Sequence, residues 1–242
     1  MNFIFTIAGK GIRFLNEGIH TPKFLLKLND SRTILNHILS DCIFPEYSNL
    51  YFLFHRKYKN VENEIFQDIS LLPEHVNVSI SFCDDTSGQA ETVWLASQQI
   101  ENNAAIVIMN NDTILRDRNF YLLRKKLSEG RSCYVDIFEP DEKINALSYV
   151  KQQNSIISDI QEKIVVSDFA SSGLYGFSSA NLYQELYCTT HFERQEKYIS
   201  YVIKQALEKN IKVFSHCIHD ETDTLILGTP LQYHAYMKRT LA

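Results

Sequence analysis

The chain begins with an apolar run that leads directly into a glycine-rich segment: Asn2-Phe3-Ile4-Phe5-Thr6-Ile7, then Ala8-Gly9-Lys10-Gly11-Ile12-Arg13-Phe14. The run predicts a buried strand, and the glycines predict a turn whose backbone can approach a ligand closely. Free N–H groups in such a turn form a concavity that binds anions. Arg13 adds a planar fork of donors, and Lys23, in Pro22-Lys23-Phe24, adds a mobile charge. These features predict a polyphosphate site at the end of the first strand.

Apolar runs alternate with helical spacing through the first half of the chain. We expect strands at residues 3–7, 50–55, 76–82 and 105–109, and helices at 33–40, 57–66 and 89–100. This alternation predicts βαβ units around a mainly parallel sheet, whose ligands lie beyond the carboxyl ends of the strands. The glycine-rich turn and Asn110-Asn111-Asp112 both follow such ends. We therefore expect them to share one site.

After a helix expected at 118–129, the pattern changes to short strands separated by polar turns. The expected strands are 133–138, 147–151, 156–161, 173–177 and 211–215, and the expected helices are 178–188, 198–209 and 231–238. No repeat or clear linker interrupts the sequence. We therefore expect a single domain over residues 1–242, with a first half at 1–130 and a second half at 131–242 that extends the same sheet.

Composition excludes several classes of protein. The net charge is −5, which argues against a basic nucleic-acid-binding surface. No apolar stretch approaches the ~20 residues of a membrane span, and the first residues are typical of a core strand, not of a signal peptide. The five cysteines are scattered, without C-x-x-C pairs, which fits a reducing compartment. We expect a cytoplasmic protein without nucleic-acid or membrane partners, and its oligomeric state stays open.

Six further motifs follow the glycine-rich segment in order. They are Thr86-Ser87-Gly88-Gln89-Ala90-Glu91-Thr92, Asn111-Asp112, Glu162-Lys163, Gly173-Leu174-Tyr175-Gly176-Phe177, Glu196, and Leu227-Gly228-Thr229-Pro230. Together, the motifs resemble the signature of the sugar-phosphate nucleotidyltransferases over residues 2–233. The likeness is greatest to the branch with A-G-x-G-x-R-F that serves bacterial surface-polysaccharide pathways.

The resemblance implies a Rossmann-like, GT-A-type α/β fold with a mixed, mainly parallel sheet and helices on both faces. It also implies that an NTP and a sugar 1-phosphate react, with Mg²⁺, to give an NDP-sugar and pyrophosphate for capsule or other surface-polysaccharide synthesis. The first half would bind the nucleotide and the second half the acceptor.

The resemblance assigns roles to individual residues. The catalytic residues would be Arg13 and Lys23; the nucleotide would contact Ala8, Gly9, Gly11, Gly88 and Gln89; the acceptor would contact Asn111, Glu162, Lys163, Gly173 and Glu196; and the metal would be held by Asp112 and Asp223. In this scheme Arg13 holds the leaving phosphates, while Lys23 bridges the α-phosphate and the acceptor phosphate.

Three positions depart from the family pattern. Ile12 stands where the family usually has Thr or Ser, and Phe24 replaces the second Pro of P-K-P. Ile226 stands where the family often has a second metal-binding Asp, and Asp223 and Asp220 precede it by three and six residues.

These departures keep other functions open. A cytidylyltransferase acting on a choline- or polyol-phosphate would use the same phosphate machinery with a different acceptor pocket. A GT-A glycosyltransferase would need D-x-D after the fourth strand, where this chain has Asn110-Asn111-Asp112. A non-catalytic nucleotide-sugar-binding protein would explain Ile226 but not Arg13 and Lys23.

Overall fold

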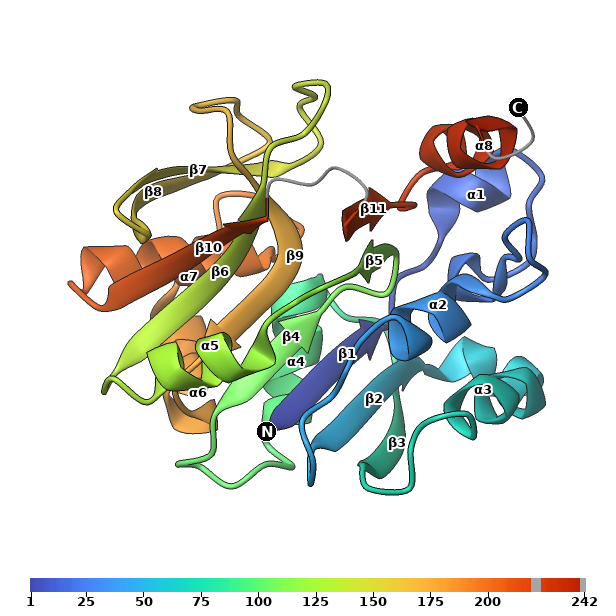
Figure 1. Cartoon of the computed structure of the whole chain (residues 1–242), viewed down its shortest axis with the longest axis horizontal. Coiled ribbons are helices and arrows are strands. Elements are labelled where there is room, and N and C mark those ends of the chain that lie inside the picture. The colour runs from blue at the N-terminus through green and yellow to red at the C-terminus, as the bar shows by residue number, and fades with distance from the viewer. Residues whose placement is uncertain (219–222, 240–242) are drawn as a thin grey trace.

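The computed structural model describes residues 1–218 and 223–239. Within them, nine strands form one sheet in the order β3-β2-β1-β4-β9-β6-β10-β8-β7 (Figure 1). The strands are β1 (Asn2–Ile7), β2 (Asn49–His55), β3 (Asn77–Cys83), β4 (Ile106–Met109), β6 (Ser132–Phe138), β7 (Ser148–Gln153), β8 (Ile156–Glu162), β9 (Ala170–Phe177) and β10 (Lys212–Ile218). A single sheet therefore runs through both halves of the chain.

The sheet is mixed. Strands β1 to β4 pair in parallel, as the alternation of strands and helices in the first half predicts. Strand β9 runs antiparallel to both of its neighbours, β4 and β6. Strand β8 is antiparallel to β10 and β7. The antiparallel pairs thus involve the second half, where short strands follow one another with polar turns between them.

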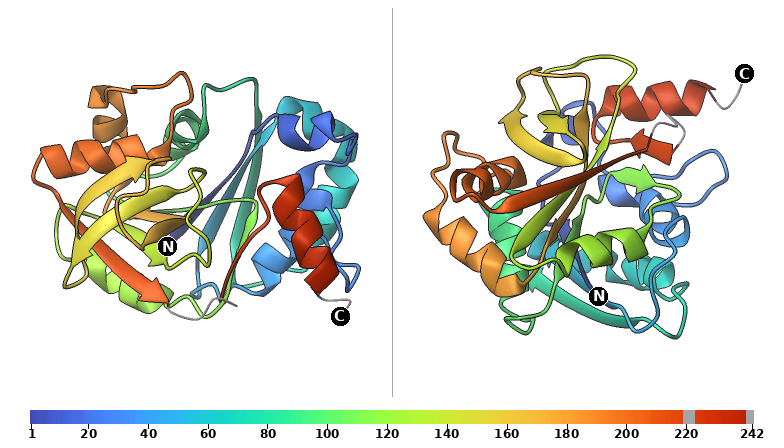
Figure 2. Two further views of the ribbon diagram at one scale, coloured as in Figure 1. Left: turned by 90° about the horizontal axis from the view of Figure 1, so that it is seen from above. Right: turned by 60° about the vertical axis from the view of Figure 1, so that its left-hand side comes forward.

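The sheet lies between two hydrophobic cores. Successive side chains of a strand point to opposite faces, so Phe3 and Phe5 enter one core and Ile4 enters the other. Helices α2 (Ile34–Ser40), α3 (Glu62–Ile69) and α5 (Phe120–Leu127) contribute to the first core. Helices α4 (Gln89–Ser97), α6 (Ala180–Thr189) and α7 (Ile199–Glu208) contribute to the second, and the layers can be followed in Figure 2.

A small ribbon outside the main sheet joins distant parts of the chain. Strand β5 (Thr113–Leu115) pairs antiparallel with β11 (Thr224–Ile226). Helix α8 (Pro230–Arg239) follows and lies beside α1 (Ile12–Asn16), where Tyr233 contacts Phe14 with ring centroids 6.5 Å apart (Figure 1). The Tyr233 hydroxyl also donates to the Lys27 carbonyl at 2.8 Å. The last helix therefore packs on the segment that carries Arg13 and Lys23.

A buried ion pair ties the ribbon to the sheet. The Arg118 guanidinium lies 2.9 Å from the Asp136 carboxylate, and the two side chains are 3% and 2% exposed. Ser172 donates a second hydrogen bond to Asp136 at 2.6 Å. Arg118 also donates to the Asp223 carbonyl at 2.8 Å and to the Thr224 hydroxyl. One guanidinium thus connects β6 with the start of β11.

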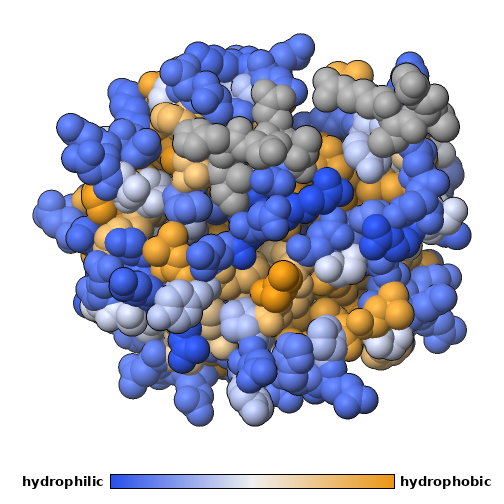
Figure 3. All heavy atoms as spheres, in the orientation of Figure 1, coloured by the Kyte–Doolittle hydropathy of each residue, from blue (hydrophilic) through white to orange (hydrophobic). Residues whose placement is uncertain are grey.

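The surface is mostly polar. On the face shown in Figure 3, hydrophilic residues dominate the rim, and apolar residues show between them nearer the centre. In the part of the chain that the structure describes, no helix combines the length and apolar character needed to cross a bilayer.

Candidate active site

The glycine-rich segment forms a loop between β1 and α1. Gly11 adopts a φ of +69°, a left-handed conformation that glycine takes without strain. The loop is held from one side, because the Tyr58 hydroxyl donates to the Gly9 carbonyl at 2.9 Å and Lys57 Nζ donates to the Lys10 carbonyl at 2.7 Å. A Cβ atom added at Gly9 or Gly11 would meet nothing within 4 Å. The loop therefore borders open space in which a ligand can approach the backbone.

Arg13 lies on α1 directly after this loop, and its side chain is exposed. Burial and the nearby Glu196 raise the pKa of Tyr198, whereas the positive charge of Arg13 lowers it. Tyr198 belongs to the second half of the chain. The charge of Arg13 thus reaches Tyr198, which lies two residues after Glu196.

Lys23 and Asp112 meet at the centre of the site. Lys23 begins a short 3-10 helix, η1 (Lys23–Leu25), and its Nζ lies 2.6 Å from Asp112 Oδ2. Asp112 follows β4, and its carbonyl accepts from the Leu227 N–H at 2.7 Å. A Cβ at Gly228 would lie 2.8 Å from Asp112 Oδ2, so the glycine lets the turn pack closely on this carboxylate without displacing it. Three separate motifs of the sequence therefore converge here.

The substitution at Phe24 has a structural explanation. Phe24 is fully buried and packs edge-on against Tyr58, with ring centroids 5.1 Å apart. Tyr58 in turn binds the glycine-rich loop. Phe24 thus anchors Lys23 to the same core that supports the loop.

The segment before α4 connects the two halves. Gln89 Nε2 donates to Asn110 Oδ1 at 2.8 Å and to Thr6 Oγ1 at 3.2 Å, which places Gln89 across the ends of β1 and β4. Gly88 has a φ of +142° and packs against Lys197. The Lys197 N–H donates to the Ser87 carbonyl at 2.8 Å, and its carbonyl accepts from the Ala90 N–H at 2.9 Å.

We expect Gly88→Ala to lower the free energy of unfolding by about 1–3 kcal/mol, because the backbone conformation excludes other residues. The added Cβ would also lie 2.6 Å from the Lys197 carbonyl oxygen. Urea denaturation measures the change, and Gly9→Ala is the matched control because its Cβ would meet nothing. Equal stability of the two variants would contradict the close packing at Gly88.

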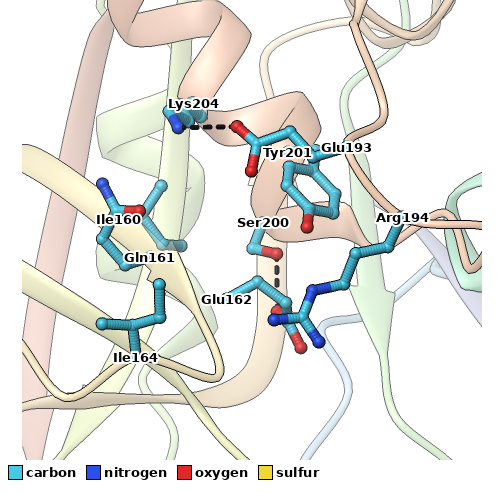
Figure 4. A pocket seen from close by; sticks show the side chains of 9 residues that line it. All are labelled: Ile160, Gln161, Glu162, Ile164, Glu193, Arg194, Ser200, Tyr201 and Lys204. Atoms are coloured by element: carbon cyan, nitrogen blue, oxygen red, sulfur yellow. Dashed lines mark hydrogen bonds and ion pairs between the residues drawn. The ribbon is translucent and has the colours of Figure 1, made fainter.

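Glu162 ends β8 and is buried. Its carboxylate accepts from the Ser148 hydroxyl at 2.5 Å and from the Ser200 hydroxyl at 2.7 Å. Figure 4 shows Glu162 in a small pocket that Arg194 and Tyr201 also line. The predicted acceptor contact thus lies in a polar pocket between β8 and α7.

Lys163 and Glu196 share a single partner. Lys163 has a φ of +60°, and its Nζ donates to the Tyr198 hydroxyl. The Tyr198 hydroxyl donates to the Glu196 carboxylate. Lys163 Nζ also lies 4.4 Å from the centroid of the Tyr198 ring, within the range of a cation–π interaction.

Gly173 joins this region to the nucleotide half. It lies on β9 with a φ of +89°, and a Cβ there would lie 2.2 Å from Asn110 Nδ2. The absence of a side chain therefore lets Asn110 approach β9. Asn111, the next residue, is buried.

Asp223 is not brought together with Asp112. Asp223 precedes β11 and lies beside Arg116, whose N–H donates to the Asp223 carbonyl at 2.9 Å, whereas Asp112 pairs with Leu227 beyond the other end of β11. Asp220 lies outside the described residues. Nowhere in residues 1–218 and 223–239 do three or more His, Cys, Asp or Glu side chains gather as they would around a metal ion.

Sequence reasoning missed three residues that shape this site, namely Lys57, Tyr58 and Tyr198. Lys57 and Tyr58 lie in an expected helix and carry no signal of a role in the loop. Tyr198 adjoins Glu196, and that proximity is the one sequence signal that could have found it.

Comparisons with known structures show the same fold. A nucleoside-diphosphate-sugar pyrophosphorylase from Vibrio cholerae RC9 is 22% identical, with a TM-score of 0.77 over 98% of this chain and 100% of that chain. A UDP-glucose pyrophosphorylase complexed with UDP-glucose is 15% identical, with a TM-score of 0.78 over 99% and 98%. The inositol-1-phosphate CTP transferase from T. maritima is 13% identical, with a TM-score of 0.71 over 97% and 93%. No curated protein matches the chain by sequence.

A match to a family model identifies the family of this chain. Residues 6–237 match the model described as nucleotidyl transferase. The match includes the glycine-rich loop, the Lys23–Asp112 pair and the turn at Gly228, so the likeness that these motifs indicate is confirmed at the level of the family. The chain therefore belongs to the nucleotidyl transferase family and is an enzyme of this type.

Proposed function

We propose that the protein condenses an NTP with a sugar 1-phosphate to give an NDP-sugar and pyrophosphate. The observation that carries the proposal is the Lys23–Asp112 pair, with Nζ and Oδ2 2.6 Å apart. Lys23 is anchored through Phe24 and Tyr58 to the glycine-rich loop, and Asp112 follows β4. The names of two structural relatives, a nucleoside-diphosphate-sugar pyrophosphorylase and a UDP-glucose pyrophosphorylase, support a sugar nucleotide as the product.

The chemistry needs positioning and neutralisation of charge more than covalent catalysis. An oxygen of the sugar phosphate attacks the α-phosphorus in line, and pyrophosphate leaves. The loop backbone from Ala8 to Gly11 and the guanidinium of Arg13 bind the leaving phosphates. Lys23 cancels the repulsion between the α-phosphate and the incoming phosphate. Gly88 and Gln89 contact the base and the ribose.

Asp112 has the chemistry of a Mg²⁺ ligand. Its side chain is 18% exposed, and it lies beside the proposed phosphate site. Mg²⁺ is commonly held by one or two carboxylates together with substrate phosphates, so a single carboxylate fits. When bound, the ion would neutralise charge on the phosphates. Asp112 is the protein ligand that we propose, because Asp223 lies at the other end of β11.

The acceptor would bind in the second half, where Gly173 packs on Asn110 and where Glu162 and Lys163 lie at the end of β8. We place the reaction in the cytoplasm, as a supply of activated sugar for capsule or another surface polysaccharide. The support for this role is the A-G-x-G-x-R-F form of the loop, Ala8 to Phe14.

A screen for pyrophosphate release tests the proposal. Four NTPs are combined with a panel of sugar 1-phosphates and alcohol phosphates, with Mg²⁺ or with EDTA. We expect one NTP to react with a sugar 1-phosphate, EDTA to abolish the reaction, and the isosteric Asp112→Asn variant to lose about 100-fold in turnover. Reaction with alcohol phosphates alone would favour the cytidylyltransferase alternative. Consumption of a nucleotide sugar without pyrophosphate release would favour a glycosyltransferase.

A further inference from the structure

Tyr198 contacts Lys163 and Glu196 and is reached by the charge of Arg13. It directly precedes α7, with extended backbone angles of φ −86° and ψ 151°, and its side chain makes no hydrogen bond that caps the helix. The side chain is half-buried. Its hydroxyl is bound by Lys163 and Glu196, two of the residues that the sequence assigns to the acceptor.

The hydrogen bonds of Tyr198 have the pattern expected of a sugar hydroxyl. The phenolic oxygen accepts from the Lys163 ammonium group and donates to the Glu196 carboxylate. A hydroxyl of an acceptor between the same two groups would accept and donate in the same way. Lys163 Nζ is further held over the ring, 4.4 Å from its centroid.

The charges around Tyr198 keep it a donor. Burial raises the pKa of its phenol, and the hydrogen bond to Glu196 and the charges of Glu196 and Glu162 raise it further. Arg13 acts in the opposite direction. The hydroxyl is therefore protonated at neutral pH and stays available to donate a hydrogen bond to the Glu196 carboxylate.

We propose, on the basis of the proposed function, that Tyr198 is a specificity-determining residue whose phenol takes the place of one acceptor hydroxyl. The preferred substrate is then a phosphorylated sugar that lacks a hydroxyl at that position, such as a deoxy sugar 1-phosphate. An acceptor that carries the hydroxyl must displace the phenol or leave its own hydroxyl without a partner. Either outcome selects against it.

The test compares glucose 1-phosphate with its monodeoxy analogues as acceptors. Tyr198→Ser removes the ring and hydroxyl from this position and introduces a preferred residue at the helix N-cap, so α7 should keep its stability. Tyr198→Phe removes the hydroxyl alone. The matched control is Tyr121→Ser, because Tyr121 lies on α5 and is 79% exposed.

We expect the wild-type enzyme to prefer at least one deoxy analogue over glucose 1-phosphate by about tenfold or more in kcat/KM. Tyr198→Ser should remove this preference through the KM of the acceptor, with the KM of the NTP unchanged. Tyr198→Phe should be intermediate, and Tyr121→Ser should match the wild type. An unchanged preference in Tyr198→Ser, or an equal rise in both KM values, would overturn the inference.

Binding measurements separate this inference from the proposed function. Calorimetry with the same sugar phosphates, in the presence of a non-reactive NTP analogue, needs no turnover. Selective binding that depends on Tyr198 without any pyrophosphate release would contradict the proposed function and support the inference. Turnover whose selectivity is independent of Tyr198 would contradict the inference alone, and an absence of sugar-phosphate binding would contradict both.

Discussion

Replacing Lys23 with methionine should lower kcat/KM about 100- to 1,000-fold, the range found when one charge-stabilising donor is removed from an active site. The Lys23 ammonium group lies 2.6 Å from Asp112, which follows β4. In the proposed reaction, two phosphate anions must approach each other at this point. Methionine keeps an apolar stem beside the buried Phe24 but removes the charge, so thermal stability should change much less than activity.

The matched control is Lys27→Met. Lys27 is exposed and lies four residues further along the same segment, so its replacement should leave pyrophosphate release unchanged. The variant at Lys23 also releases the Asp112 carboxylate from its ion pair. Mn²⁺ binding without nucleotide, followed by electron paramagnetic resonance, should therefore become tighter in Lys23→Met. Near-normal activity, or a loss of stability as large as the loss of activity, would contradict the assigned role.

Much of the fold could be predicted because its signals are local. The strands of the first half are apolar runs that end in turn residues, and the structure has them at the expected places. The helix expected at 57–66 does not form over its whole length. Residues Arg56–Val61 form a 3-10 segment, η2, and α3 begins at Glu62. In η2, Lys57 and Tyr58 bind carbonyls of the glycine-rich loop, a tertiary contact that no local pattern reveals.

The parts that could not be predicted depend on contacts between distant segments. Strands β5 and β11 have three residues each, too few to show periodicity, and they pair across more than 100 positions of the sequence. This pairing brings Gly228 against Asp112. It also explains why Asp223 lies away from Asp112, since the extended segment from Asp223 to Leu227 spans about 13 Å at the usual rise per residue. The family resemblance had assigned Asp223 to the metal together with Asp112.

The residues assigned to the acceptor show the same limit of prediction from sequence. Motifs indicated Lys163 and Glu196 individually, but not that both bind Tyr198. That arrangement depends on the left-handed backbone of Lys163 at the end of β8 and on the position of Tyr198 before α7. Sequence reasoning thus found the elements that carry the candidate site, while the side-chain contacts within it required the fold.

Removing the carboxylate of Asp136 should lower the free energy of unfolding by about 3–5 kcal/mol, the usual cost of leaving one member of a buried ion pair without its partner. In Asp136→Ala, the Arg118 guanidinium would stay buried, with only 3% of its side chain exposed. Burial raises the pKa of Asp136, while the charge of Arg118 and the hydrogen bonds from Ser172 and Arg118 lower it. Arg118 therefore favours the charged form of Asp136, and the Asp136 carboxylate in turn stabilises the buried Arg118 guanidinium.

The double variant Arg118→Met, Asp136→Leu should recover most of this loss, because apolar side chains of similar volume can replace a buried pair. The control is Asp168→Ala, which breaks the exposed Lys143–Asp168 pair and should leave the free energy of unfolding nearly unchanged. Urea denaturation measures the free energy of unfolding of all three variants.

The buried pair also connects to the active site. Arg118 holds Thr224 at the start of β11, and β11 leads to the turn at Gly228 that packs on Asp112. Asp136→Ala should therefore weaken pyrophosphate release as well. If Asp136→Ala is no less stable than Asp168→Ala, the buried pair does not hold the ribbon in place.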